Sequence, residues 1–364
     1  MSINLNTRRG YAATVALAVL GTGGAYADTT LYTSSNGAAG NAVIVIEQAP
    51  DGVLSLAETY PTGGTGTGGG LGNQGAIAID DDFLFVINAG SDEVSAFRRL
   101  ADSLELVGTV PSGGTRPVSV TVDRDVVYVV NAGSDNIAGF RVAESGALSP
   151  IAGSTRPLSG TGTGAAQIGF SKDGRVLVVT ERATNNVSTW AVERDGLPGI
   201  YQVFASPGAT PFGFTFTKGR RLLVSEAAGG AAGASSVSSW KVSPGGSLTL
   251  LDPVVPTLQS AACWVAVTPN GRFAYTTNTA SGSLTAYSVR GDRLDLLDVD
   301  GLAASTGAGT APIDLAISPD GEFLHTLNAG TDEIASFRIR RDGSLESRGI
   351  LPGLPDGATG LVAE

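Results

Sequence analysis

The sequence predicts an all-β fold, a seven-bladed β-propeller with four antiparallel strands in each blade. The first observation behind this prediction is composition, because the 364 residues include 51 glycines and 17 prolines, and 42% of them are hydrophobic. Glycine and proline at this frequency leave little room for helices of about 11 to 12 residues, so helical bundles and α/β barrels are disfavoured. The apolar content is high enough to fill a large core.

The second observation is an internal repeat, in which an apolar strand ends in a small polar turn and a second strand follows with an aromatic residue. Residues 84–98 and 127–141 match almost position by position, since both contain Asn-Ala-Gly-Ser-Asp between the two strands. Further copies run over residues 176–190, 222–240, 273–287 and 323–338, and a degenerate copy runs over residues 31–46. Seven copies of such a unit are typical of a propeller or a solenoid.

The third observation is the spacing of a second kind of strand, which precedes the later copies. These inner strands are expected at residues 76–79, 118–122, 167–170, 212–216, 264–267 and 313–317. Their last residues lie 43, 48, 46, 51 and 50 positions apart, which is the length of a four-stranded propeller blade. Asp-Gly and Asn-Gly pairs after several of these strands favour tight hairpin turns.

The first repeat lacks an inner strand of its own, and a matching strand occurs at residues 360–363, at the end of the chain. We expect this last strand to join the first blade, because the pairing closes the ring and removes two free sheet edges. A fourth, outer strand is expected after turns such as Asp51-Gly52 and Asp195-Gly196. Seven blades then fill residues 28–364 and leave no second domain.

Residues 1–27 are expected to be a signal peptide. Arg8 and Arg9 precede an apolar run over residues 11–20, and Ala25-Tyr26-Ala27 is a small-x-small cleavage pattern. No segment reaches the roughly 20 apolar residues that a membrane span needs, so none is expected. Cleavage near Ala27 predicts a periplasmic or secreted protein, exported by the general or the twin-arginine route.

The charge balance excludes one class of partner. The chain carries 23 basic and 34 acidic residues, a net charge of −11, and such a chain repels nucleic acid and anionic membrane surfaces. Cys263 is the single cysteine, so no disulfide can form within the chain. We expect a monomer whose stability comes from packing.

In a propeller, the loops that lead into the inner strands and the turns that join the second and third strands gather on one face, around a central funnel. Such loops commonly carry binding residues, so functional side chains are expected there. The residues predicted to bind a substrate on this face are Arg116, Gln74, Gln167, Trp264, Asn278 and Asn328.

Two blades depart from the repeat on this face. Where other blades have Asn, blade four contains Glu181, followed by Arg182, and blade five contains Glu226. Carboxylates from neighbouring blades could activate water or move a proton, and Arg182 could hold a substrate carboxylate or a developing oxyanion. Glu181, Glu226 and Arg182 are therefore the predicted catalytic residues. The alternative is that both carboxylates only accept backbone hydrogen bonds in their turns.

No cofactor is predicted. The glycine-rich stretches 63–72, 160–164 and 305–310 lead toward inner strands and not toward helices, so they lack the helix N-terminus of a phosphate-binding loop. Glu, Asn and Asp at a propeller axis could hold a divalent cation, but no compact ligand spacing indicates one. The only histidine, His325, takes a strand position that other blades fill with tyrosine, so it is expected to pack in the core.

Four segments carry a resemblance to a known family. They are the hairpins Ser318-Pro319-Asp320-Gly321 and Thr268-Pro269-Asn270-Gly271, the segment Val179-Thr180-Glu181-Arg182, and Cys263-Trp264-Val265-Ala266-Val267 followed by Tyr275-Thr276-Thr277-Asn278. Together they resemble the seven-bladed lactonase propellers, which include bacterial 6-phosphogluconolactonases and fungal carboxymuconate lactonizing enzymes. The resemblance covers residues 31–364. It implies a lactonase-type site at the funnel, with Glu181, Arg182 and Glu226 as the residues carried over.

We therefore expect an exported, lactonase-like propeller that hydrolyses or forms a lactone of a non-phosphorylated sugar or organic acid. Export and the scarcity of basic residues argue against a phosphorylated sugar lactone. One alternative is a non-catalytic propeller that binds a carboxylate ligand or a protein partner in the cell envelope. The other is a cycloisomerase or lyase of the muconate-lactonizing type, which would use the same carboxylates for proton abstraction.

Overall fold

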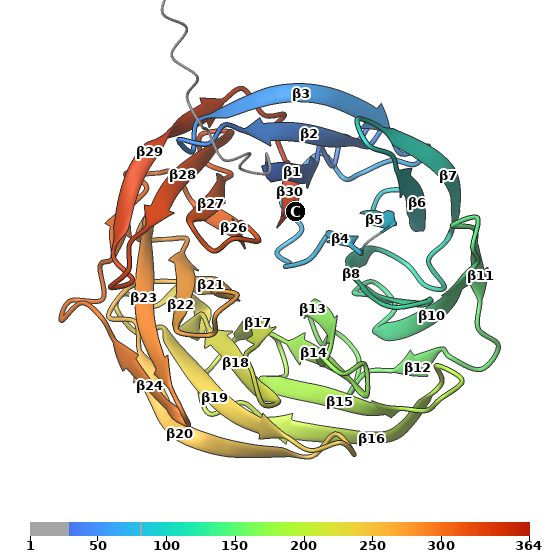
Figure 1. Ribbon diagram of the computed structural model, residues 1–364. Coiled ribbons are helices and arrows are strands. Elements are labelled where there is room, and N and C mark those ends of the chain that lie inside the picture. Colours follow the sequence, from blue (N-terminus) through green and yellow to red (C-terminus); the bar gives the residue numbers. More distant parts are fainter. Residues whose placement is uncertain (1–28, 81) are drawn as a thin grey trace, which may run out of the picture.

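The computed structural model describes residues 29–80 and 82–364, which form seven β-sheets arranged in a ring around a central axis (Figure 1). Each sheet is one blade, with four antiparallel strands in order from the axis outward, and two blades carry a further short strand. The predicted seven-bladed, all-β fold is confirmed. The predicted signal peptide lies outside the described residues.

In every blade the first strand lies nearest the axis and the others follow outward. Blade one has β30 (Thr359–Ala363), β1 (Thr29–Ser34), β2 (Ala42–Gln48) and β3 (Leu54–Pro61). Blade two has β4 (Ile77–Ile79), β5 (Phe83–Asn88), β6 (Glu93–Arg99) and β7 (Leu104–Pro111). Blade three has β8 (Pro117–Asp123), β9 (Val126–Asn131), β10 (Asn136–Val142), β11 (Leu148–Pro150) and β12 (Arg156–Pro157).

Blade four has β13 (Ala165–Phe170), β14 (Val176–Glu181), β15 (Asn186–Val192) and β16 (Pro198–Ala205). Blade five has β17 (Pro211–Phe216), β18 (Arg221–Glu226), β19 (Ser236–Val242) and β20 (Leu248–Pro256). Blade six has β21 (Ala262–Val267), β22 (Phe273–Asn278), β23 (Ser283–Arg290), β24 (Arg293–Leu296) and β25 (Ala304–Ser305). Blade seven has β26 (Pro312–Ile317), β27 (Phe323–Asn328), β28 (Glu333–Ile339) and β29 (Leu345–Pro352).

A 3-10 helix of three residues, Ala228–Gly230, is the one helical element that the structure describes. No helix in residues 29–80 and 82–364 is long and apolar enough to cross a membrane.

The C-terminal strand closes the ring, as predicted. β30 pairs with β1 in blade one, with Tyr32 opposite Val362 (Figure 1). The backbones of Thr30 and Glu364 extend this pairing by two hydrogen bonds, of 3.1 and 2.9 Å. The side chain of Glu364 also contacts Arg99 and the hydroxyl of Tyr32, so the last residue ties blade one to blade two.

Apolar side chains pack between neighbouring blades, and the aromatic position of the repeat lies in this core. Trp190 and Trp240, which replace the Phe or Tyr of other blades, are buried. His325 is also buried and its Nε2 lies 2.6 Å from Oε1 of Gln48, so the predicted packing role is confirmed. Burial lowers the pKa of His325 to about 3, which keeps the ring neutral.

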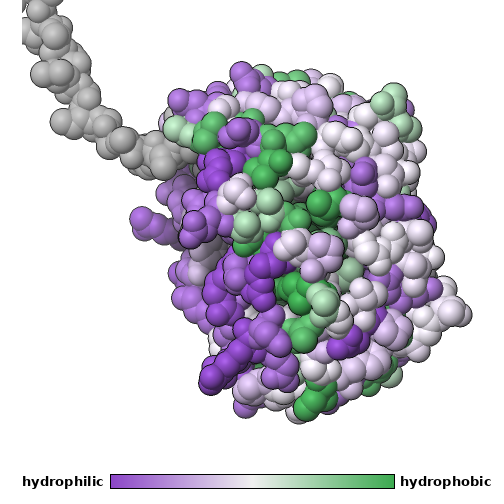
Figure 2. All heavy atoms as spheres, turned by 90° about the vertical axis from the view of Figure 1, so that its right-hand side faces the viewer, coloured by the Kyte–Doolittle hydropathy of each residue, from purple (hydrophilic) through white to green (hydrophobic). Residues whose placement is uncertain are grey.

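The disc has two faces of different chemistry. The loop face consists of the loops that lead into inner strands, such as residues 62–76, and the turns that join second and third strands, such as residues 182–185. The hairpin face consists of the turns that join first to second and third to outer strands, such as residues 318–322 and 340–344. Figure 2 shows strongly hydrophilic residues gathered along one face of the disc, at left, with a paler face opposite. The hydrophilic side matches the Asp, Glu, Lys and Arg of the hairpin turns, whereas the loops are rich in Gly, Ser and Thr.

Candidate functional site

The last residue of the second strand occupies the same buried position in six blades. These residues are Asn88, Asn131, Glu181, Glu226, Asn278 and Asn328, and each is 0% exposed. In several blades a hydroxyl at the start of the loop that leads into that blade's own inner strand donates to this side chain. Thr62 donates to Asn88 and Ser112 donates to Asn131, each at 2.7 Å. The position therefore fastens the loops of the loop face to the blades.

Glu181 makes the same kind of contact with more donors. The hydroxyls of Ser188 and Thr184 donate to its carboxylate at 2.6 and 2.8 Å, and both the hydroxyl and the backbone N–H of Ser159 donate to it as well. Ser159 stands where Ser112 stands in the preceding blade. Four donors leave this carboxylate no free lone pair directed at a ligand.

Glu226 is held by serines in the same way. The hydroxyl of Ser236 donates to it at 2.8 Å and that of Ser206 lies 3.4 Å away. Burial raises the pKa of the Glu226 carboxyl to about 7, although its hydrogen bonds from serines lower it. The phenol of Tyr287 lies nearby, and its pKa is raised by burial and by the charge of Glu226.

The structure places four of the predicted site residues in buried positions. Glu181, Glu226, Asn278 and Asn328 lie inside the blades and not at the surface of the loop face. Asn278 donates to Thr285 at 2.9 Å and Asn328 donates to Glu333 at 3.0 Å, within their own blades. The alternative from the sequence was that both Glu carboxylates only accept backbone hydrogen bonds in their turns. Both carboxylates do accept structural hydrogen bonds, but side-chain hydroxyls supply most of the donors. Their predicted role as bases gains no support from this placement.

Arg182 differs from these residues because its charge is not neutralised. Its side chain is half-buried, and Nε donates to the backbone oxygen of Gly164 at 3.0 Å. Its guanidinium carbon lies 5.2 Å from the centroid of the Phe212 ring. Within residues 29–80 and 82–364, no carboxylate forms an ion pair with Arg182, and neither terminal nitrogen makes a hydrogen bond. A fixed guanidinium with free terminal nitrogens can receive an oxyanion in two-point fashion.

Arg116 adds a second positive charge to this part of the loop face. Burial lowers the pKa of Arg182, the nearby Cys263 opposes this shift, and repulsion from Arg116 adds to it. Arg116 is exposed, and its backbone N–H, at φ +50°, donates to Asp92 at 2.6 Å. Since neither guanidinium forms an ion pair within the described residues, the two positive charges favour an anionic ligand.

An aromatic pair continues from Arg182 toward blade six. The rings of Phe212 and Trp264 lie 4.9 Å apart, and Trp264 is 3% exposed. The buried indole Nε1 has no hydrogen-bond partner in the part of the chain that the structure describes. Cys263 is buried beside Trp264, and burial raises the pKa of its thiol to about 11, so it is not a nucleophile at neutral pH.

The two predicted glutamines bridge inner strands of different blades. Oε1 of Gln167 accepts from the backbone N–H of Phe214 at 2.6 Å, and Nε2 of Gln167 donates to the backbone oxygen of Phe214 at 3.1 Å. Gln74 donates through Nε2 to the backbone oxygen of Val265 at 3.4 Å, while its buried Oε1 has no partner among the described residues. Both side-chain polar atoms of Gln167 are thus used in contacts between blades, whereas Oε1 of Gln74 has no hydrogen-bond donor among the described residues.

Sequence reasoning missed the residues that make room for these side chains. A Cβ at Gly72 would lie 2.6 Å from a terminal nitrogen of Arg182, and a Cβ at Gly213 would lie 2.0 Å from Oε1 of Gln74. Phe212, which supports Arg182, was also missed, although its place in the inner strand of blade five was predicted. The signal available was glycine inside the strand segment Pro211–Phe216, since such a glycine indicates a close approach by another group.

The described residues contain no cluster of three or more His, Cys, Asp or Glu that could hold a metal ion. Asp314, at the inner strand of blade seven, is buried, and burial raises the pKa of its carboxyl well above the usual range. It accepts from the backbone N–H of Leu315 at 2.8 Å. Asp314 is therefore a structural residue of the inner ring.

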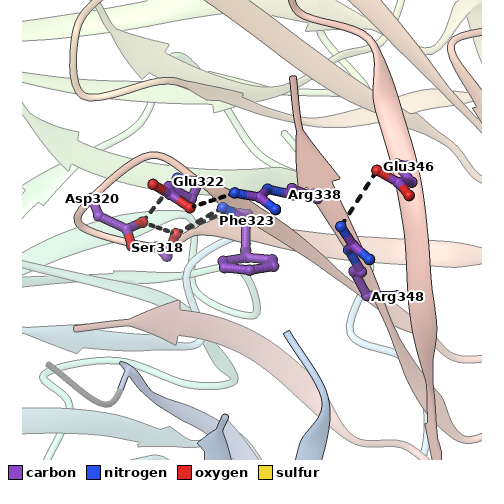
Figure 3. Close-up of polar contacts among 7 residues, drawn as sticks. All are labelled: Ser318, Asp320, Glu322, Phe323, Arg338, Glu346 and Arg348. Carbon is purple, nitrogen blue, oxygen red and sulfur yellow. Dashed lines mark hydrogen bonds and ion pairs between the residues drawn. The ribbon is translucent and has the colours of Figure 1, made fainter. Parts of the chain in front are cut away.

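Several grooves lie on the hairpin face, and one of about 720 Å³ is lined by residues such as Tyr32, Glu58 and Arg99. Another, of about 530 Å³, is lined by residues such as Asp123, Arg141 and Asp173, and a third, of about 680 Å³, by residues such as Arg272, Glu322 and Arg338. Figure 3 shows the region of the third groove, where Arg338 reaches Glu322 at 3.2 Å. Because Arg141 and Arg338 already have carboxylate partners, volume alone does not identify a ligand site there.

The family model of the seven-bladed β-propeller lactonases matches the chain over residues 30–159, 152–231 and 225–351. Similar solved structures include a putative 6-phosphogluconolactonase from Bacteroides fragilis, 18% identical, with a TM-score of 0.70 over 93% of this chain and 98% of that one. A periplasmic gluconolactonase from Pseudomonas aeruginosa is 17% identical, with a TM-score of 0.72 over 92% of this chain and 98% of that one.

A protein from Lactobacillus plantarum is 19% identical, with a TM-score of 0.74 over 93% of this chain and 99% of that one. At these identities the likenesses show a shared fold. No curated protein matches the chain.

Proposed function

Because the chain belongs to the seven-bladed β-propeller lactonase family, we propose that its loop face hydrolyses a lactone, with the Arg182 guanidinium as the group that holds negative charge. The observation that carries this proposal is the unpaired, half-buried Arg182, held at Nε by Gly164 and placed over Phe212. The chain is acidic overall, so a cation without a partner carboxylate at this point is best explained by a ligand that supplies the negative charge.

In the proposed reaction, the oxygen of a water molecule attacks the carbonyl carbon of the lactone. The ring carbon–oxygen bond then breaks, the ring oxygen takes up the proton that the attacking water loses and becomes a hydroxyl, and the product is a hydroxy acid. The terminal nitrogens of Arg182 donate to the carbonyl oxygen as its negative charge grows. Donors fixed in advance lower the barrier to such a step, by about 100-fold to 1,000-fold in rate for one donor. Arg116 adds favourable potential for the carboxylate product.

A lactone of a non-phosphorylated sugar or organic acid is the proposed substrate class. Two arginines, one of them exposed, suit a carbonyl or a single carboxylate better than a phosphate dianion, which usually takes more donors. The proposed export of the chain supports the same choice, since Arg8, Arg9 and the Ala25-Tyr26-Ala27 pattern precede the propeller.

The test is hydrolysis of glucono-1,5-lactone by the wild-type chain, Arg182→Gln and Arg182→Lys. We expect Arg182→Gln to lose about 100-fold or more in kcat/KM, and Arg182→Lys to lose less because it keeps the charge without the planar fork. Arg156→Gln is the matched control, since Arg156 lies on the same face and bonds to the backbone oxygen of Thr155 at 3.0 Å. Turnover by Arg182→Gln at the wild-type rate would contradict the proposal.

A second candidate function is anion binding without catalysis. It is favoured by the placement of Glu181, Glu226 and His325, all 0% exposed, so that none of the three can act as a general base at the surface of the loop face. This function predicts that gluconate binds through Arg182 while glucono-1,5-lactone is hydrolysed no faster than in buffer.

A further inference from the structure

The glycine-rich loop over residues 62–76, between β3 and β4, is held in its middle by one buried asparagine. The side chain of Asn36 accepts from the backbone N–H of Thr67 at 2.9 Å and donates to the backbone oxygen of Gly69 at 2.8 Å. Asn36 itself is 2% exposed and has φ +47°. Residues 67–69 of the loop are therefore fixed to blade one.

At its other end, the loop is tied to the inner strands of several blades. The hydroxyl of Thr359, in blade one, donates to Asn73 at 3.1 Å, and Asn73 in turn donates to the backbone oxygen of Val118, in blade three. These contacts join the loop to two blades that are not its own.

The next residue reaches still farther across the ring. The backbone N–H of Gln74 donates to the oxygen of Ala166 in blade four at 3.0 Å, and its side chain bonds to Val265 in blade six. Its Oε1 lies against Gly213 in blade five, where any Cβ would overlap it. Asn73 and Gln74 together thus connect the loop to five other blades, around the axis.

Gly72 lies between residues 67–69, which are fixed to blade one, and the anchored residues Asn73 and Gln74. It faces Arg182. A Cβ at position 72 would lie 2.6 Å from one terminal nitrogen of Arg182, 3.3 Å from Cζ and 3.4 Å from the other terminal nitrogen. The backbone of Gly72 is therefore packed against the whole guanidinium. With Phe212 beside it and Gly164 bonded to Nε, the guanidinium is confined by groups from three blades.

We propose that residues 72–74 are a positioning element that fixes the Arg182 guanidinium for its anionic ligand, with Gly72 as the contact and Asn73 and Gln74 as the anchors. This inference rests on the proposed function, because it assigns a second element to the same site. The element comes from blade two and Arg182 from blade four, so the site depends on a contact across the ring.

The experiment compares Gly72→Ala with two matched controls. Gly72 has φ +62°, so an added methyl group brings both a clash with Arg182 and backbone strain. Gly162→Ala reproduces the strain alone, since Gly162 has φ +65° and nothing within 4 Å of an added Cβ. Gly70→Ala changes the same loop at a position with neither a positive φ nor a neighbour.

The readout that needs no ligand is the hydrogen exchange of the Arg182 Nε–H, observed by NMR and assigned with Arg182→Lys. The hydrogen bond to Gly164 protects this proton in the wild type. We expect Gly72→Ala to exchange it about tenfold faster or more, with both controls unchanged. The second readout is kcat/KM for glucono-1,5-lactone, which we expect to fall about tenfold or more in Gly72→Ala alone, because a small displacement of a positioned group is costly.

The two proposals can fail separately. Wild-type exchange in Gly72→Ala, or an equal loss in Gly162→Ala, would overturn the positioning role even if Arg182 proves essential for turnover. If no variant, including the wild type, hydrolyses the lactone, but Gly72→Ala alone releases the Arg182 proton, the positioning role stands and the proposed hydrolysis fails.

Discussion

Among the described residues, carboxylates of the hairpin face form ion pairs, whereas those of the loop face do not. On the hairpin face, carboxylates pair with arginines, as Glu322 does with Arg338 at 3.2 Å and Glu346 with Arg348 at 3.4 Å (Figure 3). Carboxylates on both faces accept backbone N–H groups, as Asp320 of the hairpin face does from Glu322 at 2.8 Å. On the loop face, Asp92 accepts from residue 116 at 2.6 Å and Asp135 accepts from residue 163 at 2.9 Å.

Arginines without an ion pair occur on both faces of the described chain, but Arg272 and Arg341 of the hairpin face are exposed, whereas Arg182 of the loop face is half-buried. Arg182 and Arg116 form no ion pair with a carboxylate of the described residues. On the hairpin face, Arg338 pairs with Glu322, and Arg340 and Arg348 pair with Glu346. A ligand site is therefore indicated by unneutralised charge and not by the number of charged residues or the size of a groove.

The largest effect on stability is expected at a loop-face carboxylate. Glu181→Ala would remove the acceptor of three hydroxyls and one backbone N–H in a buried position. We expect a loss of roughly 2 to 4 kcal/mol in the free energy of unfolding, measured with urea. Glu322→Ala on the hairpin face is the control and should cost about 0.5 kcal/mol or less. Equal losses would remove the contrast between the two faces.

A pH-dependent effect of smaller size is expected at Glu226. Its carboxyl has a pKa of about 7 in the folded chain, raised from the ordinary value of 4.5, so the folded state binds the proton more tightly than the unfolded chain does. Stability from this group is therefore full below about pH 4.5 and falls as the pH rises toward 7, by roughly 3 kcal/mol in all. Glu226→Gln should abolish that fall, measured as the urea midpoint at about pH 5 and pH 8.

The same variant separates a structural Glu226 from a catalytic one. A catalytic base with this pKa would make kcat/KM rise through neutral pH, and Glu226→Gln would abolish turnover. We expect turnover to persist in the variant without a change in the shape of the pH profile. Loss of activity with a folded chain would restore the role predicted from the sequence.

The smallest effect is expected for a paired arginine of the hairpin face. The side chains of Arg338 and Glu322 are 47% and 46% exposed, and exposed pairs contribute about 0 to 1 kcal/mol. Arg338→Gln should change the thermal midpoint by a few degrees at most and leave lactone hydrolysis unchanged. A large loss of turnover in this variant would move the site to the hairpin face.

The fold could be predicted because each blade repeats one pattern of strands and turns, and the ring follows from the displaced strand at residues 360–363. Arg182 could be placed on the correct face for the same reason. The burial of Glu181 and Glu226 could have been inferred, since both stand at the position of a repeated Asn, and a repeated polar residue indicates a shared structural contact. Their divergence was instead interpreted as function.

The contacts of Gly72 with Arg182 and of Gly213 with Gln74 could not be predicted in this way. Each joins residues more than 100 positions apart, and in each contact one partner lies in the loop over residues 62–76, outside the repeat. The length and path of that loop decide both contacts, and the repeat carries no information on that path. Irregular loops added to a regular scaffold thus complete the site.

The central claim is that the half-buried guanidinium of Arg182, on the loop face, is the anion site of this propeller. It is tested most directly by calorimetric titration of gluconate into the wild-type chain, Arg182→Gln and Arg338→Gln at low ionic strength. We predict saturable binding that is lost in Arg182→Gln and retained in Arg338→Gln. Equal binding by all three, or loss only in Arg338→Gln, would contradict it.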